Sequence, residues 1–178
     1  MIIQLIQRMG AVQSSLPQLP SKMTILDVSN KNSSNLGFQI QPNHPVTKIF
    51  ASNNHIQHFP LSLDNLQTIV IESNNLNKIF EKYPSIQFNF PNLIELNIAR
   101  NLLIQVPDAV FLFPNLENLD LSINSLTTID SSKLTFPKLS FLNISRNSLT
   151  SIPDVSSLPS LSLLNCRLNE ITDCSIHQ

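Results

Sequence analysis

The sequence has 178 residues, of which 42% are hydrophobic, and a formal net charge of −1. A chain of this size can form one folded unit, and its balanced charge excludes binding modes that need an excess of basic residues, such as nucleic-acid or acidic-lipid binding. Only 2 glycines occur, which excludes glycine-rich phosphate loops and dinucleotide fingerprints. We therefore expect no cofactor.

Residues 1–22 form an N-terminal segment for which two structures are predicted. One is a short helix that caps the core, with an apolar side made by Ile2, Ile3, Leu5, Ile6 and Met9. The other is a decayed repeat, because LPQL at 16–19 is similar to LPSL at 158–161. A secretory signal peptide is disfavoured, since the apolar run is short and contains Gln4.

From residue 23 onward one sequence frame recurs. Its clearest copy has apolar residues at positions 1, 4, 6, 11 and 14 and an asparagine at position 9: Leu116, Leu119, Leu121, Leu126 and Ile129, with Asn124. Copies begin at residues 23, 46, 66, 93, 116, 139 and 161. All except the first have the asparagine: Asn54, Asn74, Asn101, Asn124, Asn147 and Asn169. The fixed spacing argues against an ordinary α/β domain with leucine-rich strands.

The frame predicts one short strand in each copy. Successive side chains of a strand alternate between its faces, so positions 4 and 6 should point into a core and positions 3, 5 and 7 should point outward. An asparagine at position 9 offers a donor and an acceptor, so stacked asparagines can satisfy backbone groups from one copy to the next. Lys31, at position 9 of the degenerate first copy, offers only donors, so this turn should be closed differently or exposed.

Between the strands, the chain should return through irregular or short 3-10 segments. Prolines punctuate these segments, as in Phe90-Pro91, Phe113-Pro114, Phe136-Pro137 and Leu158-Pro159, and they disfavour long helices. Cys166 and Cys174 fall on interior positions 6 and 14, where they should be small buried residues. We expect no metal site, because His55 and His58 form only a weak pair in a turn that should be solvated.

The pattern over residues 23–178 resembles the leucine-rich repeat family, whose repeats span roughly 20–29 residues. This resemblance implies an α/β solenoid, a horseshoe with a parallel β-sheet on the concave face and mostly irregular or 3-10 segments on the convex side. The predicted domains are the segment 1–22 and a repeat domain 23–178 of about seven repeats. The last repeat looks incomplete at Gln178, so we expect either a partner over this end or a longer polypeptide.

The concave face is the predicted binding site, since a curved sheet offers a long continuous surface. Exposed aromatic residues beside arginines match the composition of interface hot spots. Phe50 and Val70 form an early group, and a late group collects Phe141, Leu163, Ile123 and Leu168 with Arg100, Arg146 and Arg167. The candidate partner-binding residues are Phe50, Val70, Arg100, Asp120, Ile123, Phe141, Arg146, Leu163 and Arg167.

We therefore expect a non-catalytic module that binds a protein or peptide partner. The alternative is the ligand-sensing or regulatory part of a longer receptor or receptor-like kinase. An enzyme is disfavoured: Asp27 and Asp120 lie four repeats apart, roughly 19 Å, too far for paired-carboxylate catalysis.

The sequence also carries expectations about membrane insertion, oligomeric state, cellular location and glycosylation. No transmembrane run is present, and we expect a monomer unless the C-terminal edge self-associates. A cytoplasmic location is expected, because cysteine-rich caps common in secreted relatives are missing, and an extracellular one if the chain belongs to a receptor. The sequons at Asn32 and Asn143 do not exceed their chance frequency.

Overall fold

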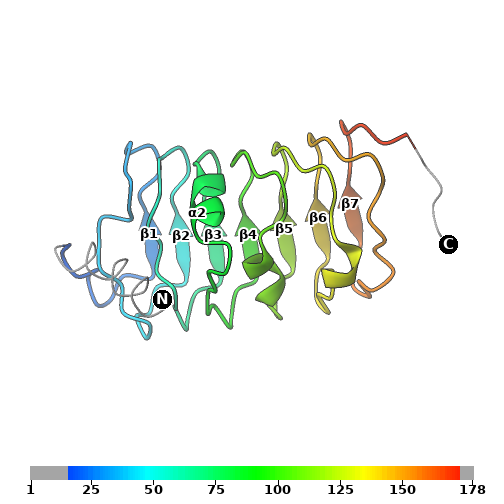
Figure 1. Ribbon diagram of the computed structural model, residues 1–178. Coiled ribbons are helices and arrows are strands. Elements are labelled where there is room, and N and C mark those ends of the chain that lie inside the picture. The colour runs from blue at the N-terminus through cyan, green and yellow to red at the C-terminus, as the bar shows by residue number, and fades with distance from the viewer. Residues whose placement is uncertain (1–15, 173–178) are drawn as a thin grey trace.

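The computed structural model describes residues 16–172, which contain a single seven-stranded parallel sheet with its strands in chain order (Figure 1). Each strand has three residues. Their bounds are β1 Ile25–Asp27, β2 Lys48–Phe50, β3 Thr68–Val70, β4 Glu95–Asn97, β5 Asn118–Asp120, β6 Phe141–Asn143 and β7 Leu163–Asn165. The predicted α/β solenoid with a parallel sheet is confirmed.

The seven strands are in register with the sequence frame. Each occupies positions 3 to 5, and equal positions pair across the sheet, as Ile69 with Leu96 and Leu119 with Leu142. Residues with the same frame number therefore form rows that run across all seven strands.

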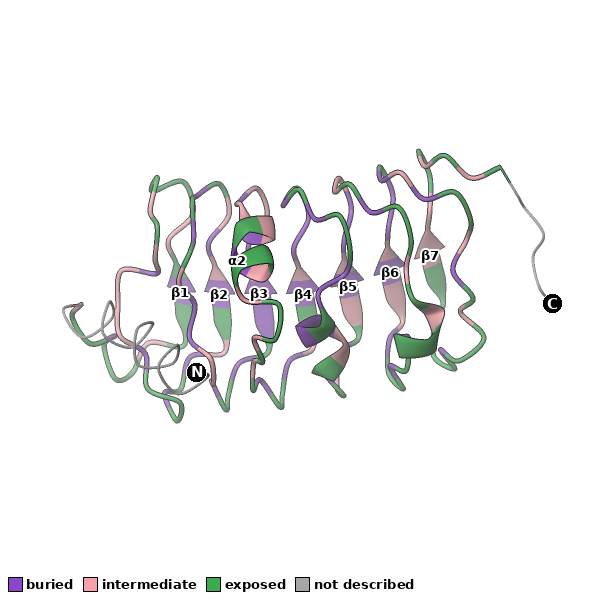
Figure 2. Cartoon of the chain, viewed as in Figure 1, coloured by how far each residue is buried: buried purple, intermediate pink, exposed green. Residues whose placement is uncertain are grey.

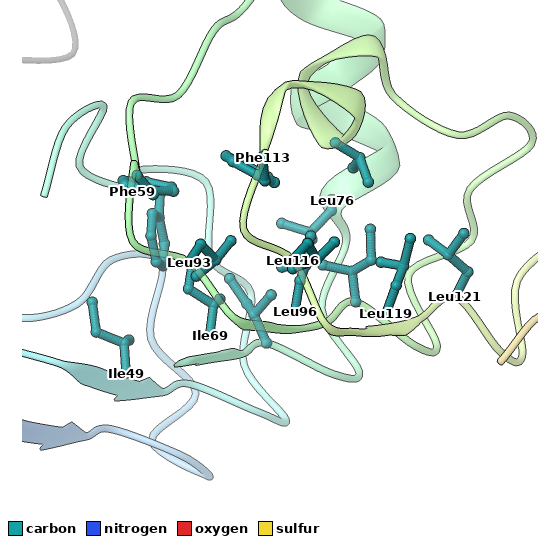
Figure 3. Close-up of a cluster of buried hydrophobic side chains, with 14 of the residues drawn as sticks. Ile49, Phe59, Ile69, Leu76, Leu93, Leu96, Phe113, Leu116, Leu119 and Leu121 are labelled. Atoms are coloured by element: carbon teal, nitrogen blue, oxygen red, sulfur yellow. The ribbon is translucent and has the colours of Figure 1, made fainter. Parts of the chain in front are cut away.

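Side chains at positions 4 and 6 build the core. Ile49, Leu119 and Leu142 at position 4 and Ile144 at position 6 have no exposed surface. The close-up in Figure 3 shows such residues from successive repeats packed together beside the helical segments. One cluster of buried residues runs from Leu19 to Leu158, so each repeat buries its apolar side against its neighbours.

The segments opposite the sheet contain only short helices, as predicted. They are α2 Leu76–Lys82, η1 Asp108–Leu112 and η2 Ser131–Lys133. The α-helix lies in the longest copy of the frame, where Leu76 and Ile79 pack toward the core. Between α2, η1 and the sheet remains an apolar cavity of about 60 Å³, lined by Ile69, Leu96 and Ala109 among others.

Junction phenylalanines stack on the core side of the return segments. The ring centroids of Phe90 and Phe113 are 5.9 Å apart, and those of Phe88 and Phe90 are 5.4 Å apart. The following proline starts a turn, closed by the N–H of Leu93 donating to the carbonyl of Phe90 at 3.1 Å. The Phe-Pro motif therefore combines an aromatic contact with a tight turn.

The asparagine ladder forms as predicted. Asn124 donates through Nδ2 to the carbonyls of Leu121 at 2.9 Å, Ser122 at 3.3 Å and, in the preceding repeat, Ile98 at 3.2 Å. Its Oδ1 accepts the N–H groups of Asn101 at 2.9 Å and Leu103 at 3.0 Å. The other position-9 asparagines repeat this pattern of bonds to their own repeat and the preceding one.

The two ends of the described chain differ. At the start, Leu19 is buried, and Lys31 is exposed with its N–H bonded to Oδ1 of Asn54, so the degenerate turn is closed by the next repeat. At the other end, the interior residues Leu164, Cys166 and Ile171 are only half-buried, since no described strand follows β7. The predicted helix at residues 2–9 and the predicted burial of Cys174 lie outside the described residues.

Candidate protein-binding face

The face of the sheet opposite the core carries the predicted site, and we call it the open face. It presents the side chains at positions 3, 5, 7 and 8 of the frame. In Figure 2 strands β1, β2, β4, β5 and β6 each have a buried middle residue between two more exposed ones, as this arrangement requires, whereas β3 has two buried residues and β7 has none. Ile25 and Leu163, both at position 3, are 52% and 55% exposed, whereas Thr68 in the same row is buried.

Position 5 has a structural role that sequence reasoning missed. Asn97, Asp120, Asn143 and Asn165 each accept, through Oδ1, the N–H group of the residue two positions later. Asp120 also accepts a bond at its Oδ2 from Nδ2 of Asn143, at 3.1 Å. Both carboxylate oxygens of this predicted binding residue are therefore engaged within the fold. A recurrent Asp or Asn directly before the last leucine of the LxxLxL segment was the available signal.

The expectation that position 7 points outward is wrong in three repeats. Ala99, Ser122 and Ser145 are all buried. The strand ends at position 5, and there an Asp or Asn side chain folds over the next residues to accept the N–H of position 7. In the preceding repeat Glu72 is half-buried instead, and no such bond is possible from Val70.

Position 8 has left-handed backbone in every repeat, with φ between 54° and 58°. Asn30 and Asn53 adopt this conformation readily, but the same position holds Ser73, Arg100, Ile123, Arg146 and Leu168. This turn directs the chain out of the sheet toward the asparagine at position 9. Because five of these seven residues are neither Asn nor Gly, their identity did not predict a left-handed backbone at this position.

The early group of predicted residues comes together at one place. Phe50 and Val70 are register partners on β2 and β3, and both side chains are half-buried. Neither can bond the backbone as the position-5 asparagines do, so this part of the open face is apolar.

The late group spans β6 and β7. Phe141 and Leu163 are register partners, and the N–H of Arg146 donates to the carbonyl of Arg167 at 2.9 Å. Both arginine side chains are exposed. Ile123 lies beside this group, since its N–H donates to the carbonyl of Ser145. Arg100 is separate: it lies two repeats earlier, and its Nε is 3.2 Å from Oε1 of Glu72.

The histidine turn is less solvated than expected. His55 is exposed, but His58 is half-buried, and its Nδ1 is buried without a hydrogen-bond partner among the described residues. Burial, followed by the positive charge of Lys82, lowers the pKa of His58. In residues 16–172 no cluster of three or more His, Cys, Asp and Glu could hold a metal ion.

Comparisons with known proteins agree with the repeat architecture. A family model described as leucine rich repeat matches residues 91–149. Epiphycan from Gallus gallus is 27% identical over 84 residues, which cover 45% of this chain and 26% of the relative. The matched part thus spans about a quarter of that relative's length. None of the helices in residues 16–172 has the length and apolar character needed to cross a membrane.

Proposed function

Because this chain is a leucine-rich repeat protein, we propose that it is a non-catalytic interaction module that binds a protein or peptide on the open face of its sheet. An interaction module is supported by the repeat architecture, by the leucine rich repeat family model and by the similarity to Epiphycan.

The late group on β6 and β7 carries this proposal. Phe141 is half-buried and Leu163 is 55% exposed at one end of this group, and at the other end Leu168 is 68% exposed next to the exposed Arg167 and in the repeat after the exposed Arg146. Phe141 and Leu163 stand on adjacent in-register strands, so little backbone entropy should be lost when a partner binds them. Apolar anchors with arginines at their edge are typical of interface hot spots.

Site-specific photocrosslinking tests the proposal. A benzophenone amino acid replaces Asn118, the register partner of Phe141 on the open face. The control places it at Ser132, which is exposed in η2 on the opposite side. In extracts of the source cells, we expect a discrete protein adduct from position 118 that is lost when Phe141→Ala is added.

The outcomes separate binding from chance contact. An adduct from position 118 that survives Phe141→Ala and Leu163→Ala would argue against the late group as the anchor. Adducts formed from position 132 and not from position 118 would overturn binding on the open face. Circular dichroism of each variant shows that loss of the adduct does not reflect unfolding.

A further inference from the structure

Two arginines on the open face lack the partner that a third one has. Arg146 and Arg167 are exposed, and neither makes an ion pair with another residue in the described part of the chain. Their backbones are hydrogen-bonded to each other, so both side chains start from neighbouring points on the sheet. Two like charges placed together attract an anion.

An ion pair elsewhere on the same face shows how a carboxylate can bind an arginine at this frame position. Arg100, at position 8 of its repeat, pairs with Glu72, at position 7 of the preceding repeat, with an Nε to Oε1 distance of 3.2 Å. Arg146 occupies position 8 two repeats later, and the residue that corresponds to Glu72 is Ser122. The same backbone geometry therefore recurs at Arg146, with φ of 55° against 54° at Arg100, but without the carboxylate.

The apolar end of this surface lies at the opposite end of the same two strands. Phe141 and Leu163 occupy position 3, whereas Arg167 occupies position 7. Four residues of extended chain separate these positions, roughly 13 Å at about 3.3 Å per residue. Asn143 and Asn165 lie between them, and their Oδ1 atoms already accept backbone N–H groups.

We propose that the surface of Phe141, Leu163, Arg146 and Arg167 binds an acidic segment of a protein partner. A carboxylate of this segment binds Arg146 on the side of Ser122, as Glu72 binds Arg100 from the preceding repeat, and Arg167 adds its positive charge from the following repeat. An apolar side chain about four residues away packs on Phe141 and Leu163. The inference rests on the proposed function, because it specifies the chemistry of the partner for the same face.

A protein carboxylate fits this surface better than a polymeric anion. The anionic contact comprises two arginines at one end of the patch, while on the same face Asp120 is half-buried on the neighbouring strand β5 and Glu95 is exposed on β4. A long polyanion laid across the strands would meet these acidic residues. The apolar pair also matches an aliphatic or aromatic side chain, which such a polymer lacks.

Selection from a random dodecapeptide display library tests the chemistry without knowledge of the partner. On the wild-type protein we expect enriched peptides with Asp or Glu three to five residues from an apolar residue. The Arg146→Gln and Arg167→Gln variants should bind a selected peptide at least roughly tenfold more weakly, since each removes a charged hydrogen-bond donor. Fluorescence anisotropy measures these affinities.

Two further variants make the test specific. Lys133→Gln is the control: it removes a positive charge from η2, on the side opposite the open face, that already pairs with Asp108 at 2.7 Å, so the affinity should stay within about twofold. Ser122→Glu supplies an internal carboxylate in the place of Glu72, and it should weaken the same peptide about as much as Arg146→Gln does.

The outcomes distinguish failure of the acidic-partner proposal from failure of binding on the open face. Enriched peptides without an acidic excess that still depend on Phe141 would overturn the acidic partner but leave binding on the open face intact. An acidic excess that persists in the double variant Arg146→Gln with Arg167→Gln would also overturn the proposal. So would equal loss of affinity with Lys133→Gln, displacement by heparin in place of peptide enrichment, or no enrichment at all.

Discussion

Single amide side chains close the turns of this fold, and Asn124 is the clearest case. Replacing Asn124 with alanine removes a donor and an acceptor that serve carbonyls and N–H groups of two repeats. We expect Asn124→Ala to lower the free energy of unfolding by more than about 1 kcal/mol. Asn118→Ala, on the open face, should be nearly neutral. Urea denaturation compares them, and equal losses would contradict the assigned roles.

The left-handed backbone at position 8 makes another residue-scale prediction. Ile123 has a φ of 54°, which a β-branched side chain adopts at an energetic cost. Ile123→Asn should therefore raise the free energy of unfolding by roughly 0.5–1 kcal/mol, because asparagine tolerates this conformation. The control is Asn53→Ile, at the same position of an earlier repeat, which should lower stability. A loss of stability in Ile123→Asn would show that contacts of the isoleucine outweigh its strain.

His58 should make stability depend on pH. Burial lowers its pKa in the folded state from the ordinary value of 6.5, so the unfolded chain binds a proton more readily. Stability is then fully present above about pH 6.5 and is lost as the pH falls from there through the folded pKa. His58→Gln should flatten this dependence, whereas replacing the exposed His55 should not. Thermal unfolding between pH 5 and pH 8 measures the difference.

At the scale of elements, α2 marks where sequence reasoning was weakest. The strands were predictable because each repeats the alternation of apolar positions 4 and 6 with outward neighbours. The helix was not, since Leu76–Lys82 is only seven residues long and depends on packing of Leu76 and Ile79 against the core. The prolines of the other return segments argued for irregular backbone, which is what most of them have.

A larger side chain in the cavity beside α2 and η1 should stabilise the fold. Ala109 is buried and lines this space of about 60 Å³. Ala109→Val adds two carbon atoms to a void, and we expect it to raise the free energy of unfolding by about 1 kcal/mol. Ala99→Val, at an equally buried site that does not line the cavity, should instead be destabilising. If both variants lose stability in urea denaturation, the cavity cannot accept the valine.

The rows of the open face were predictable, but the partners of its side chains were not. Phe141 and Leu163 share frame position 3, so a parallel in-register sheet had to bring them together. The ion pair of Arg100 with Glu72 and the double engagement of Asp120 depend on the turn that follows each strand. The sequence frame predicts which residues are neighbours on the sheet. The left-handed turn after each strand determines which of their side chains bond within the fold and which remain free to contact a partner.

At the scale of the whole molecule, stability should be graded along the chain. Each strand contacts only its neighbours, and β7 has a described neighbour on one side alone, with Leu164 and Cys166 half-buried. Hydrogen exchange followed by mass spectrometry should show amides of β4 and β5 protected at least about tenfold more than those of β7. Uniform protection would mean that the chain unfolds as one cooperative unit.

The direction of the asparagine ladder has a consequence for synthesis on the ribosome. Each position-9 asparagine reaches back to the preceding repeat, as Asn147 does to the carbonyl of Leu121 and the N–H of Leu126. A nascent repeat therefore stays open until the asparagine of its successor has emerged. At about 5–20 residues per second, this delay is on the order of 1 to 5 seconds per repeat. Folding should thus trail translation by one repeat, with the newest turn always the one most exposed to chaperones.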